Sequence, residues 1–174
     1  MQPGYHMCRW LGPWVVLFLA SACVHPNATK ATAGFPDGKA AWELLQKTLP
    51  GTWTTPNQNG SFKVSYRLIS GDSALVETWG AGSPHETETV FHPDHDQLAL
   101  THYCAQGNQA RLRMESFEGH AITFRRFDVS NRLPGQGVLS KLILRFTNNS
   151  FERIETYEGS DGKAETDVLH FKRN

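Results

Sequence analysis

Apolar and polar residues alternate along most of the chain after residue 51. Alternation with a period of two is typical of β-strands that bury one face. Such rows include Phe62, Val64, Tyr66 and Leu68, and then Leu142, Leu144 and Phe146. Short clusters of Gly, Asn, Asp and Ser separate the rows and predict turns. The pattern predicts about ten antiparallel strands, over residues 51–56, 61–69, 73–80, 85–92, 97–104, 110–117, 120–128, 138–147, 150–158 and 164–172.

One segment ahead of the strands has helical spacing instead. Residues 40–49 place Ala41, Leu45 and Leu49 on one side and charged or polar residues on the other. Spacings of three and four residues predict an amphipathic helix, which Pro50 and Gly51 end. A short helix followed by a meander of about ten strands favours a mainly β fold, an up-and-down antiparallel barrel, because closure removes exposed sheet edges.

The strongest apolar run lies near the start of the chain, between Trp10 and Ala22, with Arg9 before it. It is shorter than the roughly 20 residues that a membrane-spanning helix needs. A basic start, a short apolar centre and a small-residue exit indicate a secretory signal peptide. We therefore predict a signal peptide over 1–22, a flexible tether over 23–39 and one barrel domain over 40–174.

The five residues from Leu19 to Cys23 read Leu-Ala-Ser-Ala-Cys and resemble the lipobox of bacterial lipoproteins. The resemblance implies that Cys23 becomes the lipidated first residue of the mature protein. It also implies a lipid-anchored, periplasm-facing protein, and Val24 in place of Asp implies the outer membrane. The alternative is an ordinary signal peptide cut after Ala22.

Charge and cysteine content narrow the function classes. The 17 basic and 17 acidic residues balance, and removal of Arg9 leaves 16 against 17. No basic face emerges, so nucleic acid is not an expected partner.

Cys8 leaves with the signal peptide, and lipidation of Cys23 would leave Cys104 as the free thiol. We therefore expect packing to hold the domain without a disulfide.

Two motifs resemble a known superfamily. Gly51-Thr52-Trp53 at the first strand resembles the entry motif of lipocalins and their calycin relatives. That resemblance implies that Trp53 closes one end of the barrel beneath Lys172 or Arg173. Residues 100–109, Leu-Thr-His-Tyr-Cys-Ala-Gln-Gly-Asn-Gln, resemble a motif of uncharacterised bacterial lipocalin-like domains, although Ala110 replaces that family's Pro. The second resemblance implies a fold and brings no established reaction.

A hairpin over 85–104 gives the first candidate site. With a two-residue loop at Asp94 and His95, alternation points His85, His102 and Cys104 into the barrel. Imidazole and thiol are ligands for zinc, copper or haem iron. The alternative is a buried polar network in which His102 bonds Thr87 and Cys104 packs as a small apolar residue.

The register of strand 110–117 leaves a second alternative open. A two-residue turn at Gly107 and Asn108 would point Arg111 and Arg113 inward, where they could bind a carboxylate. A three-residue loop would instead point Leu112 and Met114 inward. We prefer the second register, because burying two arginines without carboxylate partners is costly.

These observations predict a barrel that binds a small apolar or amphipathic molecule in its interior. An enzyme is the less favoured expectation, and no cofactor is required. The alternatives are a zinc- or haem-dependent enzyme or redox protein using His85, His102 and Cys104, and a scaffold with a filled interior. The oligomeric state is left open. The expected ligand contacts are Phe91, Leu98, Leu100, His102, Cys104, Arg111 and Arg113.

Overall fold

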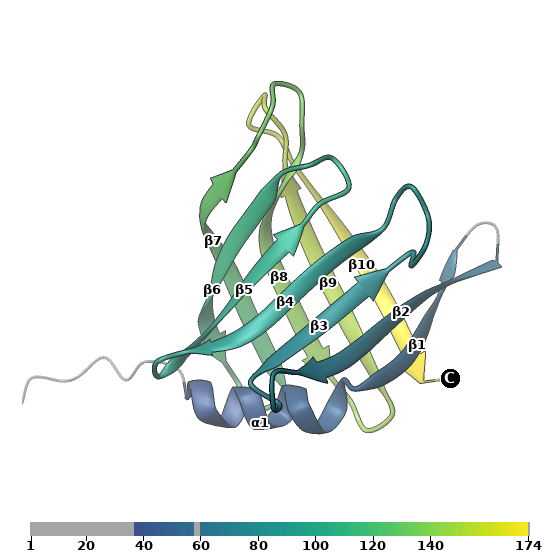
Figure 1. Cartoon of the computed structure of the whole chain (residues 1–174), viewed down its shortest axis with the longest axis vertical. Coiled ribbons are helices and arrows are strands. Elements are labelled where there is room, and N and C mark those ends of the chain that lie inside the picture. The colour runs from purple at the N-terminus through teal and green to yellow at the C-terminus, as the bar shows by residue number, and fades with distance from the viewer. Residues whose placement is uncertain (1–36, 58–59, 174) are drawn as a thin grey trace, which may run out of the picture. The chain divides into compact units, whose positions relative to one another are not determined.

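The computed structural model describes residues 37–57 and 60–173, and in them the chain forms one helix and ten strands (Figure 1). The predicted signal peptide, Cys23 and most of the predicted tether lie outside the described residues. The elements are α1 (Gly38–Thr48), β1 (Gly51–Asn57), β2 (Gly60–Ile69), β3 (Ala74–Trp79), β4 (Thr87–Asp94), β5 (Gln97–Tyr103), β6 (Gln109–Phe117), β7 (Ala121–Ser130), β8 (Val138–Phe146), β9 (Ser150–Glu158) and β10 (Ala164–Arg173).

The ten strands form a closed antiparallel barrel. Each strand pairs with its neighbours in sequence, and β1 pairs with β10 to complete the ring. The prediction of a mainly β, up-and-down barrel with a short helix before it is confirmed. The architecture is consistent with a lipocalin-like fold.

The helix α1 lies across one end of the barrel, which we call the base (Figure 1). The Asp37 side chain caps it by accepting a 2.9 Å hydrogen bond from the Ala40 amide. Gly38 is required at the first turn, because a Cβ there would lie 2.3 Å from the Asp96 carbonyl oxygen in the β4–β5 turn. The buried Ala41 and Leu45 face the core, so the apolar side of the helix closes the base.

Trp53 joins the helix to the barrel. Its indole Nε1 donates a 2.7 Å hydrogen bond to the Leu49 carbonyl oxygen, and its ring is almost completely buried. The guanidinium carbon of Arg173 lies 4.6 Å from the centre of that ring. Arg173 also donates hydrogen bonds to the carbonyl oxygens of Thr48 and Pro50. Of the two basic residues expected over Trp53, Arg173 takes that position.

Aromatic side chains fill the part of the interior next to the base. Phe151 stacks on Phe171 with ring centres 4.8 Å apart. Trp53 and Phe151 form an edge-to-face pair with ring centres 5.0 Å apart. Phe91 and Phe124 form another edge-to-face pair at 5.8 Å. Interior packing of this kind leaves few voids larger than a water molecule. This half of the barrel is therefore solid core.

The pairing between β1 and β10 is short. Only Trp53 with Arg173 and Thr54 with Lys172 are paired across it. On its other edge β10 pairs with β9 all the way from Ala164 to Lys172. The ring is thus closed near the base, and most of the β10 edge facing β1 is unpaired within the described residues.

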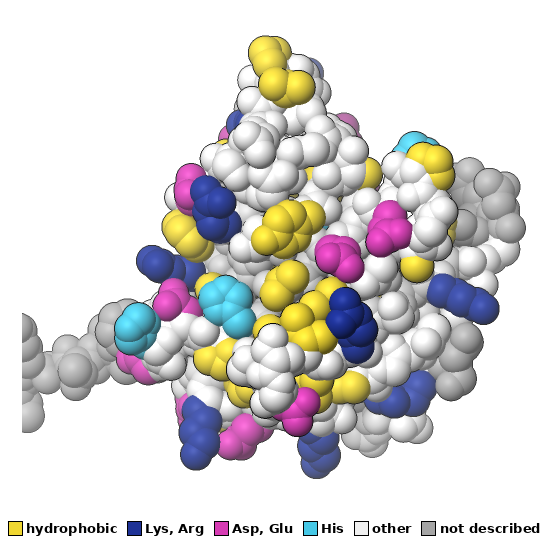
Figure 2. Space-filling model, viewed as in Figure 1, with side chains coloured by type: hydrophobic (Ala, Val, Ile, Leu, Met, Phe, Trp, Pro, Cys, Tyr) yellow, Lys and Arg dark blue, Asp and Glu magenta, His cyan; other side chains and the backbone are white. Residues whose placement is uncertain are grey.

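The outer surface carries charges of both signs. On the face shown in Figure 2, basic and acidic side chains are interspersed and do not gather by sign. Several form cross-strand ion pairs, such as Arg145 with Glu152 at 2.6 Å. Within residues 37–57 and 60–173, the structure contains no helix with the length and apolarity needed to cross a bilayer.

Candidate functional site

The inward faces of four strands change from apolar to polar with distance from the base. Strand alternation places every second residue inside the barrel, so a single strand contributes to both levels. Large apolar residues occupy the level near α1, and hydrogen-bonding residues occupy the level beyond it. The inward rows are Leu75, Glu77 and Trp79 on β3; Phe91, Thr89 and Thr87 on β4; Leu98, Leu100 and His102 on β5; and Phe151, Arg153, Glu155 and Tyr157 on β9.

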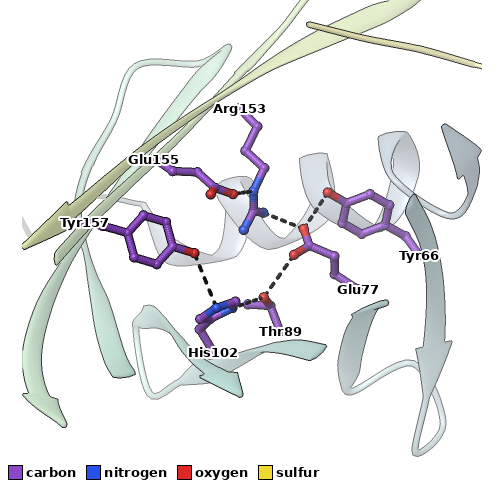
Figure 3. Close-up of polar contacts among 7 residues, drawn as sticks. All are labelled: Tyr66, Glu77, Thr89, His102, Arg153, Glu155 and Tyr157. Atoms are coloured by element: carbon purple, nitrogen blue, oxygen red, sulfur yellow. Dashed lines mark hydrogen bonds and ion pairs between the residues drawn. The ribbon is translucent and has the colours of Figure 1, made fainter. Parts of the chain in front are cut away.

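A buried ion pair forms the centre of the polar level (Figure 3). Glu77 is 0% exposed and Arg153 is 1% exposed, and Arg153 Nη1 donates to Glu77 Oε2 at 2.5 Å. Arg153 Nε donates to Oε1 of Glu155. One guanidinium is therefore shared by two carboxylates. Such pairs are costly to bury and depend on additional hydrogen bonds.

Two hydroxyl groups supply these additional bonds to Glu77. Tyr66 donates to Oε2 at 2.6 Å, and Thr89 donates to Oε1 at 2.9 Å. Burial raises the pKa of Glu77, while Arg153 and the Tyr66 hydroxyl act against this rise. Because both carboxylate oxygens only accept hydrogen bonds, the arrangement suits the ionised form. Burial and the adjacent Glu77 also raise the pKa of Tyr66, which keeps its proton on the donating hydroxyl.

The hydrogen bonds around His102 define its tautomer. Thr89 gives its only hydroxyl proton to Glu77, so its oxygen must accept from His102 Nδ1 across 3.0 Å. The other ring nitrogen, Nε2, is then an acceptor for the Tyr157 hydroxyl at 3.4 Å. Burial, with a smaller effect from Arg153, lowers the pKa of His102 from 6.5 to about 4. The network thus holds a neutral imidazole protonated on Nδ1.

A small cavity adjoins this network. Its volume is about 130 Å³. The indole Nε1 of Trp79 is buried and, within the described residues, has no hydrogen-bond partner. Buried donors are nearly always paired with protein or an ordered molecule, so an unpaired one requires an explanation. The cavity is lined by Trp79, Thr87, His102, Cys104, Arg153, Glu155 and Tyr157.

The structure brings together two of the predicted site residues. His102 is 3% exposed, and it lines the cavity together with Cys104. Phe91, Leu98 and Leu100 do point inward, but they are buried in the packed core and do not line the cavity. The expected apolar contacts therefore belong to the core level below the cavity.

Arg111 and Arg113, included among the expected ligand contacts, do not enter the interior, and the preferred register of this strand is confirmed. Tyr103 pairs with Gln109 and His102 with Ala110, so the loop between β5 and β6 is longer than two residues. This register turns Leu112 and Met114 inward, as in the preferred alternative. Outside the barrel, Arg111 Nε donates to Asp128 at 2.9 Å, and Arg113 lies over the Phe127 ring at 4.4 Å.

The expected gathering of His85 with His102 and Cys104 is also wrong. The hairpin turns at His95 and Asp96, with His95 at a φ of 60°, so Asp94 pairs with Gln97. Thr89, and not Thr87, then opposes His102, and the exposed His85 precedes the first residue of β4. Within residues 37–57 and 60–173, no three His, Cys, Asp or Glu side chains are grouped in a way that could hold a metal ion.

Sequence reasoning missed the ion pair and both tyrosines. A signal was present in the alternation: Glu77 lies between Leu75 and Trp79 in an otherwise apolar row, and Arg153 follows Phe151 by two residues. A charged residue at an inward position must have a buried partner. The sequence could not name that partner, since 76 positions separate Glu77 from Arg153.

Only the fold and the site define the class of this protein, because the comparisons with known proteins found no match. No protein-family model matches the chain, and no curated protein matches it. The chain is a closed ten-stranded antiparallel barrel, consistent with a lipocalin-like fold, with one half packed and one half polar.

Proposed function

We propose that the barrel binds a small amphipathic molecule in the cavity beside His102. The cavity beside the polar network carries the proposal, and Trp79, whose buried Nε1 has no partner within the described residues, is one of its lining residues. His102, Tyr157 and Glu155 converge on the same space from β5 and β9. Convergent polar groups in a concave interior are typical of small-molecule sites.

The cavity volume limits the size of the ligand. An engineered protein cavity of about 150 Å³ accommodates benzene. A space of about 130 Å³ therefore suits a ligand, or a ligand head, of about six non-hydrogen atoms. A long apolar tail would have to leave through the open end, because the interior towards α1 is packed. A scaffold with a filled interior is the second candidate, and the same packed core favours it.

Three probes that share a four-carbon chain and a hydroxyl test binding: 4-amino-1-butanol, 1,4-butanediol and 4-hydroxybutyrate. We expect at least one to shift the indole ¹⁵N–¹H NMR signal of Trp79, assigned through the Trp79→Phe variant. The dissociation constant should be about millimolar for a ligand of this size. Cys104→Phe should fill the cavity and abolish the shift.

Cys104→Ser is the matched control, because it keeps the small side chain and should preserve binding. If all three probes leave the Trp79 signal unchanged in the wild-type protein, the binding proposal is wrong and the filled scaffold is favoured. A shift that persists in Cys104→Phe would place the bound probe outside this cavity.

The proposed setting of the barrel is the bacterial envelope, with relationship to the lipocalin-like domains and a lipid on Cys23 as anchor. We expect Cys23→Ser to abolish incorporation of a labelled fatty acid when the full chain is produced in a bacterial host. Cys104→Ser should incorporate label normally, because its thiol lies in the folded barrel. Equal labelling of wild type and Cys23→Ser would exclude lipidation at that residue.

A further inference from the structure

The charged cluster at the cavity, counted with the buried Glu77 behind it, contains more negative than positive charge. Arg153 and Glu155 are the charged side chains that line it, and Glu77 lies behind Arg153 in direct contact. The single guanidinium therefore faces two carboxylates, while His102 is neutral. With the guanidinium already bonded to both acids, one negative charge remains uncompensated in this cluster.

Strand β10 increases this excess. Asp167 is paired with Glu155, and Glu165 is paired with Tyr157. Residues directly opposed on antiparallel strands point to the same face of the sheet, and like charges in this relation destabilise it. Both acids are exposed, so they lie at the open end and not in the core. The inward face of β9 and β10 thus carries three carboxylates and the guanidinium of Arg153.

The hydrogen-bonding atoms of Glu155 and Tyr157 that remain free also favour a positively charged ligand. Glu155 accepts from Arg153 through Oε1, and no bond to its Oε2 is found within the described residues. Tyr157 gives its proton to His102, which leaves the lone pairs of its oxygen as acceptors. Acceptors and a negative excess suit a ligand that donates hydrogen bonds and carries positive charge.

We propose that the ligand carries a primary ammonium group bound against Glu155. The ligand class is thus a small primary amine. This inference rests on the proposed function, since it names the ligand of the same cavity.

The three probes test the charge directly, because they differ only in the group at one end of the chain. At pH 7 and low salt we expect 4-amino-1-butanol to bind at least about tenfold more tightly than 1,4-butanediol, and 4-hydroxybutyrate to bind most weakly. Glu155→Gln should reduce the ratio between the affinities for the amine and the diol to about threefold or less, the part left to more distant charges.

Asp167→Asn is a second variant at an exposed position, and it should weaken amine binding about twofold to threefold through the loss of a more distant, solvated charge. It keeps the test decisive if Glu155→Gln does not fold. Glu115→Gln is the matched control, because Glu115 pairs with Arg125 on the outer surface and should not affect either probe.

The outcomes separate the charge inference from the binding proposal. Equal binding of the amine and the diol, or tightest binding of 4-hydroxybutyrate, would overturn the ammonium inference and leave cavity binding standing. Amine binding that neither Glu155→Gln nor Asp167→Asn weakens would also overturn it. Loss of binding by all three probes in the wild-type protein would end both proposals.

Discussion

Arg153→Met is expected to lower the free energy of unfolding by about 3–5 kcal/mol, because it leaves two carboxylates in the barrel without their shared cation. Glu77 is 0% exposed, so water cannot replace the lost guanidinium. Methionine keeps much of the side-chain volume, which limits the cavity contribution to the loss. Urea unfolding at pH 7, followed by far-ultraviolet circular dichroism, measures the change.

Two controls separate the buried charge from other effects. Adding Glu77→Gln to Arg153→Met should recover part of the loss, because an amide is cheaper to bury unpaired than a carboxylate. Arg125→Met removes an outer ion pair with Glu115 and should cost no more than about 1 kcal/mol. If Arg153→Met costs no more than Arg125→Met, the central ion pair does not have the role assigned to it.

The second large effect is a loss of stability in acid through His102. Its pKa is about 4 in the folded protein and 6.5 as the ordinary value, so the unfolded chain binds the proton first as the pH falls. This group's contribution is therefore complete above pH 6.5 and is lost between pH 6.5 and 4. The shift corresponds to about 3 kcal/mol, given 1.36 kcal/mol for each pKa unit.

The measurement compares the pH dependence of unfolding in wild type and His102→Gln. Glu77, whose pKa burial raises, acts with the opposite sign in part of this range, so the difference between the two proteins is the informative quantity. Arg153, Glu155 and Cys104 surround the same cavity and remain in both proteins. His95→Gln, at a side chain that is 93% exposed, should keep the wild-type slope. Identical slopes in all three proteins would contradict a buried neutral His102.

The barrel could be predicted because its signals are local. Alternation of apolar and polar residues indicates each strand, and Gly, Asn or Asp indicates each turn. The predicted strands therefore match the observed ones to within a few residues. The helix could also be predicted from the sequence, although it begins at Gly38 and not at residue 40. Neither prediction required knowledge of which distant residues meet.

The site could not be predicted to the same extent, because it depends on register. The observed register of the β4–β5 hairpin differs from the predicted one by two residues. His102 still points inward, but Thr89 lies opposite it in place of Thr87. A longer β5–β6 loop moved Arg111 to the outer face. The ion pair between Glu77 and Arg153 joins opposite walls, and no local pattern reports which strands face one another across a barrel.

The two residue pairs that join β1 to β10 also have a consequence for biosynthesis. Thr54 and Lys172 are 118 positions apart, so the ring closes through one of the longest-range contacts in the fold. Contacts of this kind form late, because their loop-closure entropy must be overcome first. During translation, the first nine strands will have emerged before β10 exists to seal them. Until then the edge of β1 is open to other chains, and Trp53 lacks the guanidinium that covers it in the finished fold.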